Sequence, residues 1–350
     1  MFSSLVGNQR AQETLRRMLS SGRVPGALLF AGEDGVGKKQ FALELARALN
    51  CNAPRVAEAC GVCPACTRIG RFKPPAADDR DAHKRIVWTE HGDVGLILPY
   101  NRSIYVDAAR ELERETNFRP FEGRARVFII EDADLLGEAN KAAANALLKT
   151  LEEPSPTSHI VLVTARPASV LSTIRSRCQA VRFAPLAPHE IEEHLVKTHK
   201  RSGEEARLAA HISRGRLAHA LALNLDDYRA EREQMLAVVE ALAPPGDRAR
   251  LLRASEELAD PKRKDAYESR LDLLETLVHD LWLLALDPSN ARVVNEDLRE
   301  RLARLGERVG PRRPARWLTH IEALRGQLVV NVNRRAATDA LLLTMEEEKP

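Results

Sequence analysis

The chain has 350 residues and a formal net charge of +3 at pH 7; 44% of the residues are hydrophobic and 29% are charged. This length is typical of about two or three domains, and the composition is typical of a soluble globular protein with packed cores. The nearly balanced charge gives no support to nucleic-acid binding by net charge, and no apolar run reaches the roughly 18 residues of a membrane span. The opening residues, MFSSLVGNQRAQETL, lack the basic-then-apolar pattern of a secretory signal, so we expect a cytoplasmic location and no membrane partner.

The strongest motif is a glycine-rich loop between a predicted strand and a predicted helix. The apolar run ALLFA at 27–31 predicts a short buried strand, and the run KKQFALELARAL that follows the loop has helical spacing. Gly32, Gly35 and Gly37 lie in the loop, and Lys38 follows them. In this context backbone N–H groups converge on a phosphate and the helix N-terminus adds favourable partial charge. The pattern indicates a phosphate loop whose lysine reaches the outer phosphates.

One position of this loop departs from the motif. A phosphate loop has Ser or Thr after its lysine, and the hydroxyl binds Mg²⁺, but this chain has Lys39. A lysine ammonium has three donors and no acceptor, so it cannot ligate a cation. We interpret the loop as a degenerate phosphate loop, with a plain glycine turn as the alternative. Whether ATP or ADP still binds there stays open from the sequence.

Four of the five cysteines lie close together after the predicted helix. Cys51, Cys60, Cys63 and Cys66 have the spacing C-x8-C-x2-C-x2-C. Four thiolates suit a closed tetrahedral Zn²⁺ site, which stabilises a fold and does not catalyse. The alternatives are two disulfides, which a reducing cytoplasm disfavours, or a redox pair, which needs two cysteines and not four. We predict a structural zinc module at 51–66, inserted in the domain that carries the loop.

A second predicted strand, RVFII at 126–130, ends in the acidic run EDAD. Acidic residues at the carboxyl end of a buried strand are where α/β folds place Mg²⁺ and water-orienting groups. A Walker B strand normally ends in Asp followed by Glu, whereas this chain has Glu131 followed by Asp132. We interpret the pair as a degenerate Walker B motif; the alternative is an ordinary acidic loop after a core strand.

The segment 140–183 predicts a helix and two strands, and it contains a pair of arginines before the second strand. An apolar stripe gives the helix, and a proline ends it. The run HIVLVT predicts a buried strand that ends in Thr164, whose hydroxyl is a candidate contact for a phosphate or a water molecule. The run IRSRC then places Arg175 and Arg177 before a last strand at 180–183.

NALLKTLEEP, the VLVT strand and SRC together resemble the clamp-loader branch of the AAA+ ATPases. In that branch the gamma/tau and delta-prime families share a four-cysteine insertion. Three further stretches resemble delta-prime: SIYVDAAREL at 103–112, the FRPFEGRARVFIIEDAD run after it, and LVVNVNRRAATDALLLTM at 328–345. The last of these resembles the last helix of delta-prime, with Asn331 and Asn333 at matching places. The resemblance covers nearly the whole chain apart from an insertion at 71–90, in a polar, proline-bearing stretch that predicts a surface loop.

The resemblance implies three domains. The first is an α/β P-loop AAA+ domain at 1–179 that carries the zinc insertion. The second is a small helical lid domain at 180–225, with RFAPLAPHEI marking the boundary. The third is an all-helical collar domain at 226–350. Its Leu- and Ala-rich stripes suit either an ordinary helical core or a collar between subunits, and the collar follows from the resemblance alone. The basic run RLGERVGPRRPARW predicts a solvated face.

The resemblance also implies a function. Active motors carry a sensor 2 arginine on a lid helix, and Ala218 stands at that position in RGRLAHAL. With Lys39 and the reversed Glu131–Asp132 order, this gives three departures that act on the same chemistry. We therefore expect a subunit that does not hydrolyse ATP; the alternative is an active ATPase of the gamma/tau type. A zinc-dependent nucleic-acid binder is disfavoured, because the cysteine segment lacks interleaved basic and aromatic residues.

Partners and one further site residue follow from the same resemblance. The expected partners are gamma/tau and delta subunits in a hetero-pentameric ring and, through the assembled complex, the beta sliding clamp and primed DNA. Arg177 of SRC is expected to act in trans, as an arginine finger on the ATP of a neighbouring subunit. The alternative for Arg177 is an ion pair with a carboxylate of its own domain.

Overall fold

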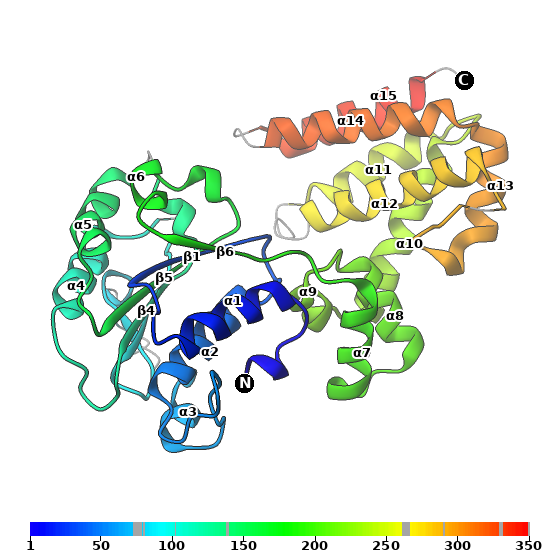
Figure 1. Ribbon diagram of the computed structural model, residues 1–350. Coiled ribbons are helices and arrows are strands. Elements are labelled where there is room, and N and C mark those ends of the chain that lie inside the picture. The colour runs from blue at the N-terminus through cyan, green and yellow to red at the C-terminus, as the bar shows by residue number, and fades with distance from the viewer. Residues whose placement is uncertain are drawn as a thin grey trace. The chain divides into compact units, whose positions relative to one another are not determined.

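The computed structural model describes residues 1–72, 79, 81–101, 103–137, 140–260, 267–289, 291–328 and 332–348 (Figure 1). The chain divides into two compact units, Met1–Ala222 and Leu223–Pro350. The first unit joins an α/β part to three short helices, and the described part of the second unit is helical. None of the helices in the described ranges is both long and apolar enough to cross a membrane.

A six-stranded sheet forms the centre of the first unit, in the order β2-β3-β4-β5-β1-β6. The strands are β1 Ala27–Ala31, β2 Val87–Trp88, β3 Val94–Ile97, β4 Arg126–Ile130, β5 Ser158–Thr164 and β6 Gln179–Arg182. All neighbouring pairs are parallel except β2 with β3. Ala31 pairs with both Thr164 and Arg182, so β1, β5 and β6 end together at one edge of the sheet.

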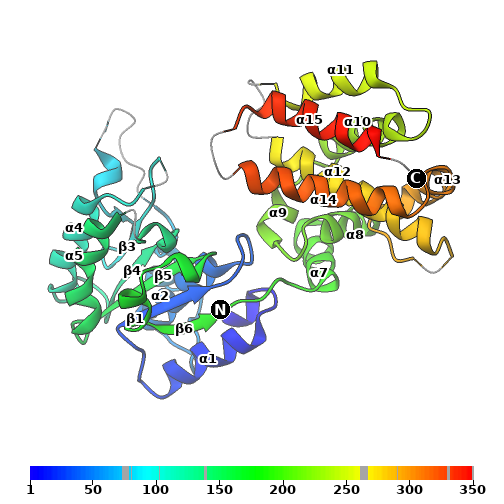
Figure 2. The ribbon, with the colours of Figure 1, turned by 90° about the horizontal axis from the view of Figure 1, so that it is seen from above.

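Helices cover both faces of this sheet. On one face α1 (Gln9–Ser20) and α2 (Lys38–Asn50) pack with Leu28 and Phe30 of β1. On the other face α4 (Val106–Thr116) and α5 (Lys141–Glu152) lie side by side, packed with Ala27 and Leu29 (Figure 2). Successive residues of a strand point to opposite faces, so coverage of both faces requires an unbroken apolar run. The runs at 27–31, 126–130 and 159–164 are buried for this reason, and the prediction of strands there is confirmed.

Short elements and the remaining helices complete the two units. The short elements are η1 Phe2–Ser4, α3 Pro64–Arg68, η2 Ala82–Lys84, η3 Ala133–Leu135, η5 Pro167–Ser169 and α6 Ser172–Arg175. The last three helices of the first unit are α7 Pro188–His199, α8 Gly203–Ile212 and α9 Leu217–Ala222. The second unit holds α10 Leu225–Leu242, α11 Arg248–Leu258, α12 Tyr267–Leu286, η7 Glu296–Leu298, α13 Arg299–Val309, α14 Arg312–Leu328 and α15 Arg334–Glu347. The predicted α/β fold with a helical C-terminal part is confirmed.

Three details differ from the sequence expectations. The stretch expected to be a surface loop contains β2, which pairs antiparallel with the unpredicted strand β3; residues 73–78 and 80 of that stretch lie outside the described residues. Strand β6 begins at Gln179 and continues past it, although the first domain was expected to end at that residue. The last helix begins at Arg334, because the Asn333 side chain accepts hydrogen bonds from the backbone N–H groups of Arg335 and Ala336 and caps the helix. Asn331 lies outside the described residues.

Candidate functional site

The phosphate loop, residues 32–39, connects β1 to α2 as predicted. Gly35 and Gly37 have φ values of +78° and +97°, in the left-handed region that residues with a Cβ atom rarely adopt. A Cβ atom on Gly32 would lie 2.3 Å from the carbonyl oxygen of Phe183, closer than real contacts allow. These three glycines are therefore required by the backbone path of the loop.

The Lys38 side chain turns back onto the loop itself. Its Nζ donates hydrogen bonds of 2.6 Å to the carbonyl oxygens of Gly32 and Glu33, and lies 3.8 Å from Asp34 Oδ1. Only 5% of the side chain is exposed. Burial lowers the pKa of Lys38, and the nearby carboxylates, Asp34 first among them, oppose this shift. The ammonium that was expected to reach a phosphate is held by carbonyls of its own loop.

Lys39 is tied to the Walker B position. Its Nζ lies 2.6 Å from Glu131 Oε1, at the end of β4, and 5.3 Å from the centroid of the Phe72 ring. Magnesium, which AAA+ nucleotide sites use, needs oxygen ligands in near-octahedral geometry. The loop offers no hydroxyl at position 39, and the carboxylate of Glu131 already has a cation beside it. The residues of the phosphate loop therefore do not fit Mg²⁺.

Asp132 and Thr164 lie at the same edge of the sheet, each in a constrained setting. Asp132 adopts a left-handed backbone conformation with φ of +46°. Burial raises the pKa of Asp132, and so do the carboxylates around it. The buried Thr164 hydroxyl donates a 2.8 Å hydrogen bond to Asp134 Oδ1, and Arg166 donates bonds of 2.9 and 2.6 Å to Asp134 Oδ2. The Thr164 hydroxyl is thus committed to Asp134, a partner that the sequence did not single out.

The start of α9 lies against the phosphate loop within the first unit. The Ala218 N–H donates a 3.0 Å hydrogen bond to the carbonyl oxygen of Gly35. A Cβ atom on Gly35 would lie 3.2 Å from Arg216 Cβ and 3.5 Å from Ala218 Cβ. Ala218 was predicted at the sensor 2 position, and its methyl group offers no charge to a phosphate. The carbonyl oxygen of Gly35 in the phosphate loop is therefore hydrogen-bonded to α9.

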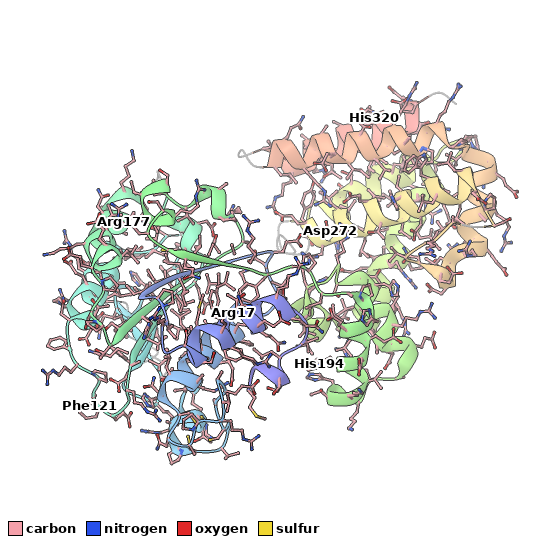
Figure 3. All side chains as sticks on the ribbon, in the orientation of Figure 1. Arg17, Phe121, Arg177, His194, Asp272 and His320 are labelled. Carbon is pink, nitrogen blue, oxygen red and sulfur yellow. The ribbon has the colours of Figure 1, made fainter. Side chains whose placement is uncertain are left out.

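Arg177 lies at the surface of the first unit, close to α5 and α6 (Figure 3). Its Nε donates a 2.7 Å hydrogen bond to Glu152 Oε1, its Nη2 forms an ion pair with the same carboxylate, and its Nη1 donates a 2.7 Å bond to the carbonyl of Thr173. In this single chain Arg177 therefore has the carboxylate partner that was the alternative to a finger role. Arg175 donates instead to the carbonyl of Pro167 at 3.0 Å. The finger role stays a prediction.

The four cysteines converge as the zinc prediction requires. Their Sγ atoms all lie within 4.8 Å of one another, and Cys51 Sγ is 3.9 Å from Cys63 Sγ. Tetrahedral ligands with Zn–S bonds of about 2.3 Å would be separated by about 3.8 Å. Two backbone N–H groups donate to sulfur, Cys60 N to Cys51 Sγ at 3.2 Å and Cys63 N to Cys60 Sγ at 3.3 Å. Together these contacts fit a tetrahedral thiolate site for a metal such as zinc.

The thiols of the cluster differ in acidity. Burial acts to raise the pKa of Cys63, but backbone N–H groups and the neighbouring thiols outweigh it and lower the value to about 6. Burial raises the pKa values of Cys51 and Cys66. Two buried and two half-buried thiols gathered in this way suit a bound dication, whose charge would favour their ionisation.

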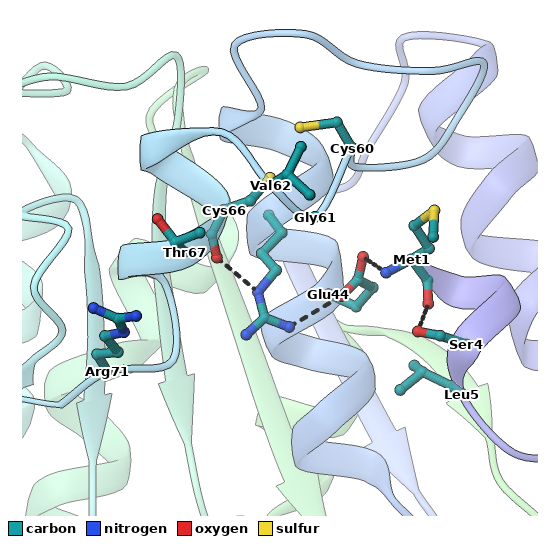
Figure 4. Close-up of a pocket in the computed structure, with 11 residues that line it drawn as sticks. Met1, Ser4, Leu5, Glu44, Cys60, Gly61, Val62, Cys66, Thr67 and Arg71 are labelled. Carbon is teal, nitrogen blue, oxygen red and sulfur yellow. Dashed lines mark hydrogen bonds and ion pairs between the residues drawn. The ribbon is translucent and has the colours of Figure 1, made fainter. Parts of the chain in front are cut away.

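Arg47 fastens the cysteine segment to α2. Its guanidinium donates to the carbonyl of Cys66 at 3.2 Å and to the carbonyl of Ile69 at 2.9 Å, and forms an ion pair of 3.1 Å with buried Glu44. Figure 4 shows a pocket lined by Glu44, Arg47 and Cys66, among others, and in this pocket the Met1 amino group also forms an ion pair with Glu44. Sequence reasoning missed Arg47 and Glu44, because their spacing on α2 looks like any exposed i,i+3 ion pair.

Comparison with known proteins adds the family. The family model described as "DNA polymerase III, delta subunit" matches residues 7–187, more than half of the chain. The DNA polymerase III subunit delta' of Escherichia coli is 31% identical, over 95% of this chain and 92% of that subunit. The chain belongs to the delta-prime family of DNA polymerase III subunits. The delta' subunit of Bacillus subtilis is 29% identical, over 97% of this chain and 96% of that subunit.

The likeness to tau subunits is narrower than the likeness to delta-prime. The DNA polymerase III subunit tau of Escherichia coli is 32% identical, but the match covers 63% of this chain and 32% of that subunit. The tau subunit of Salmonella typhimurium is 27% identical over 89% of this chain, but the match covers only 48% of that subunit. The share of the relative that is covered therefore separates these tau subunits from the delta' subunits, whereas identity alone does not. The expectation of a delta-prime family member is confirmed.

Proposed function

We propose that this delta-prime family member is a non-hydrolysing subunit of the replicative clamp loader, the assembly that opens the sliding clamp and places it on primed DNA. Membership of the delta-prime family supports the clamp-loader role. The observation that carries the non-hydrolysing part is the 2.6 Å contact between Lys39 Nζ and Glu131 Oε1. That contact joins the two positions that would bind and use Mg²⁺, and phosphoryl transfer in P-loop enzymes depends on the metal.

Two more groups that act on phosphates in a motor have internal partners in this chain. Lys38 donates to loop carbonyls, and Thr164 donates to Asp134. Catalysis requires donors that are free to meet the charge of the transition state. These contacts disfavour the alternative of an active gamma/tau-type ATPase, which needs the same groups for substrate.

The proposed partners are gamma/tau and delta subunits in a hetero-pentameric AAA+ ring, held together by the helical second unit as a collar. The beta clamp and primed DNA are reached through the assembled complex, in the cytoplasm. Zinc in the 51–66 module has a structural role. Arg177 supplies an arginine finger to the ATP site of a neighbouring motor subunit. Its partner Glu152 is 48% exposed, and exposed ion pairs are weak, at most about 1 kcal/mol, so the guanidinium is free to exchange partners.

ATP hydrolysis by the purified full chain tests the proposal. We expect no turnover above that of a Lys38→Ala variant, with or without beta clamp and primed DNA. Lys39→Thr alone is expected to leave turnover absent, because the Glu131–Asp132 order and Ala218 remain. DNA-stimulated hydrolysis by the lone chain that disappears in Lys38→Ala would show that this family member is a motor.

A further inference from the structure

Carboxylates and cations of the chain itself gather where the phosphate loop, β4 and β5 end. Three carboxylates each have a cation beside them: Lys39 Nζ lies 2.6 Å from Glu131, Arg166 Nη2 lies 2.6 Å from Asp134, and Lys38 Nζ lies 3.8 Å from Asp34. The fourth carboxylate, Asp132, is near Lys38, and burial and the other carboxylates raise its pKa. The chain supplies from its own side chains the positive charge that a bound dication would otherwise supply.

The Lys39 ammonium is held from two directions. The Glu131 carboxylate forms an ion pair with it at 2.6 Å, and the centroid of the Phe72 ring lies 5.3 Å away. Lysine is a compact, strongly hydrated charge on a long stem, so it can stand in for the charge of a metal but cannot share ligands with one. A dication entering this place would meet the ammonium as a like charge and would find Glu131 already paired.

We propose that the Lys39–Glu131 pair takes the place of the divalent cation, so that this loop excludes Mg²⁺ and any nucleoside phosphate that it accepts binds without the metal. This inference rests on the proposed non-hydrolysing function and goes beyond it, because it assigns the ligand class of the loop. The pair links α2 to the residue that follows β4.

Calorimetry of nucleotide binding to the full chain tests this inference. ADP and ATP are each titrated in buffer with 5 mM Mg²⁺ and in buffer without divalent ions. Chelators are left out so that the cysteine cluster keeps its metal. For the wild type, we expect either a Kd that Mg²⁺ changes by less than about twofold or no detectable binding in either buffer. Lys39→Thr removes the ammonium and adds a hydroxyl, and we expect Mg²⁺ to strengthen its binding by about tenfold or more, which corresponds to about 1.4 kcal/mol. Lys39→Arg is the matched control, because it keeps the charge and the reach to Glu131, and it should behave as the wild type does.

Two results would overturn the inference. One is wild-type binding that Mg²⁺ strengthens tenfold or more. The other is a Lys39→Thr variant, folded by its unfolding midpoint and metal content, that still shows no response to Mg²⁺. Metal-dependent binding by the wild type without turnover defeats this inference and leaves the proposed function standing, whereas turnover by the wild type defeats the proposed function.

Discussion

Replacing Arg177 with alanine is expected to lower clamp- and DNA-stimulated ATP hydrolysis in a reconstituted loader, while Arg175→Ala leaves it near the wild-type rate. A finger delivered across an interface contributes about 10³- to 10⁵-fold at its own site, and a ring with several sites shows a smaller loss. Arg175 is the matched control, because it has the same charge two residues away and its guanidinium donates to the Pro167 carbonyl of its own chain. Steady-state hydrolysis of the assembled complex gives the measurement.

The contact with Glu152 supplies a second control. If Arg177 only serves its own chain through that ion pair, Glu152→Ala should reproduce the loss of hydrolysis. The finger hypothesis predicts that it does not, and that Arg177→Lys fails as Arg177→Ala does, because lysine lacks the planar fork. Size-exclusion chromatography must show that every variant still assembles. Full hydrolysis in an assembled Arg177→Ala loader would sink the hypothesis.

The second large effect is expected at the cysteine cluster. Purified protein, prepared without chelators, should hold one zinc ion per chain, and Cys66→Ser should lose most of it. Structural zinc contributes on the order of 10 kcal/mol or more in small modules, so loss of one ligand should loosen the segment from Cys51 to Ile69 and expose it to proteases. Elemental analysis and limited proteolysis measure the two consequences.

Cys178 provides the control for this experiment. It is the fifth cysteine and does not belong to the group whose Sγ atoms lie within 4.8 Å of one another, so it is not expected to bind the metal. Cys178→Ser should therefore keep its zinc and its protease resistance. Less than about half an equivalent of zinc in the wild type, or a full equivalent in Cys66→Ser, would count against the site.

The parts of the fold that sequence reasoning found are those with a strong local signal. Strand β4 was predicted at its observed bounds, because four apolar residues run together between Arg126 and Glu131. Strand β2 has two residues and β3 has four, one of them a glycine, so neither is long enough to show a periodic pattern. The buried Asp93 was missed for a different reason. It accepts three backbone N–H bonds from the loop at 121–123, a contact that only the folded chain brings together.

Sequence reasoning predicted which residues belong to the site better than it predicted which of them contact one another. Parallel strands end at one edge of a sheet, so Glu131 and Thr164 could be expected near the phosphate loop from their places after predicted strands. Nothing local to Lys39 indicates that it pairs with Glu131, since the two are far apart in the sequence and meet only when α2 packs on the sheet. The same holds for Thr164 with Asp134 and for Arg177 with Glu152.

Lys38→Ala in the assembled loader tests the central claim most directly, because it disables the phosphate loop of this chain alone while the motor subunits keep theirs. Clamp- and DNA-stimulated ATP hydrolysis, measured per complex, should match that of the wild-type assembly, since the proposed function assigns no turnover to this chain. A loss of about twofold or more in an assembly that retains all subunits would contradict the account and place an active ATP site in this chain.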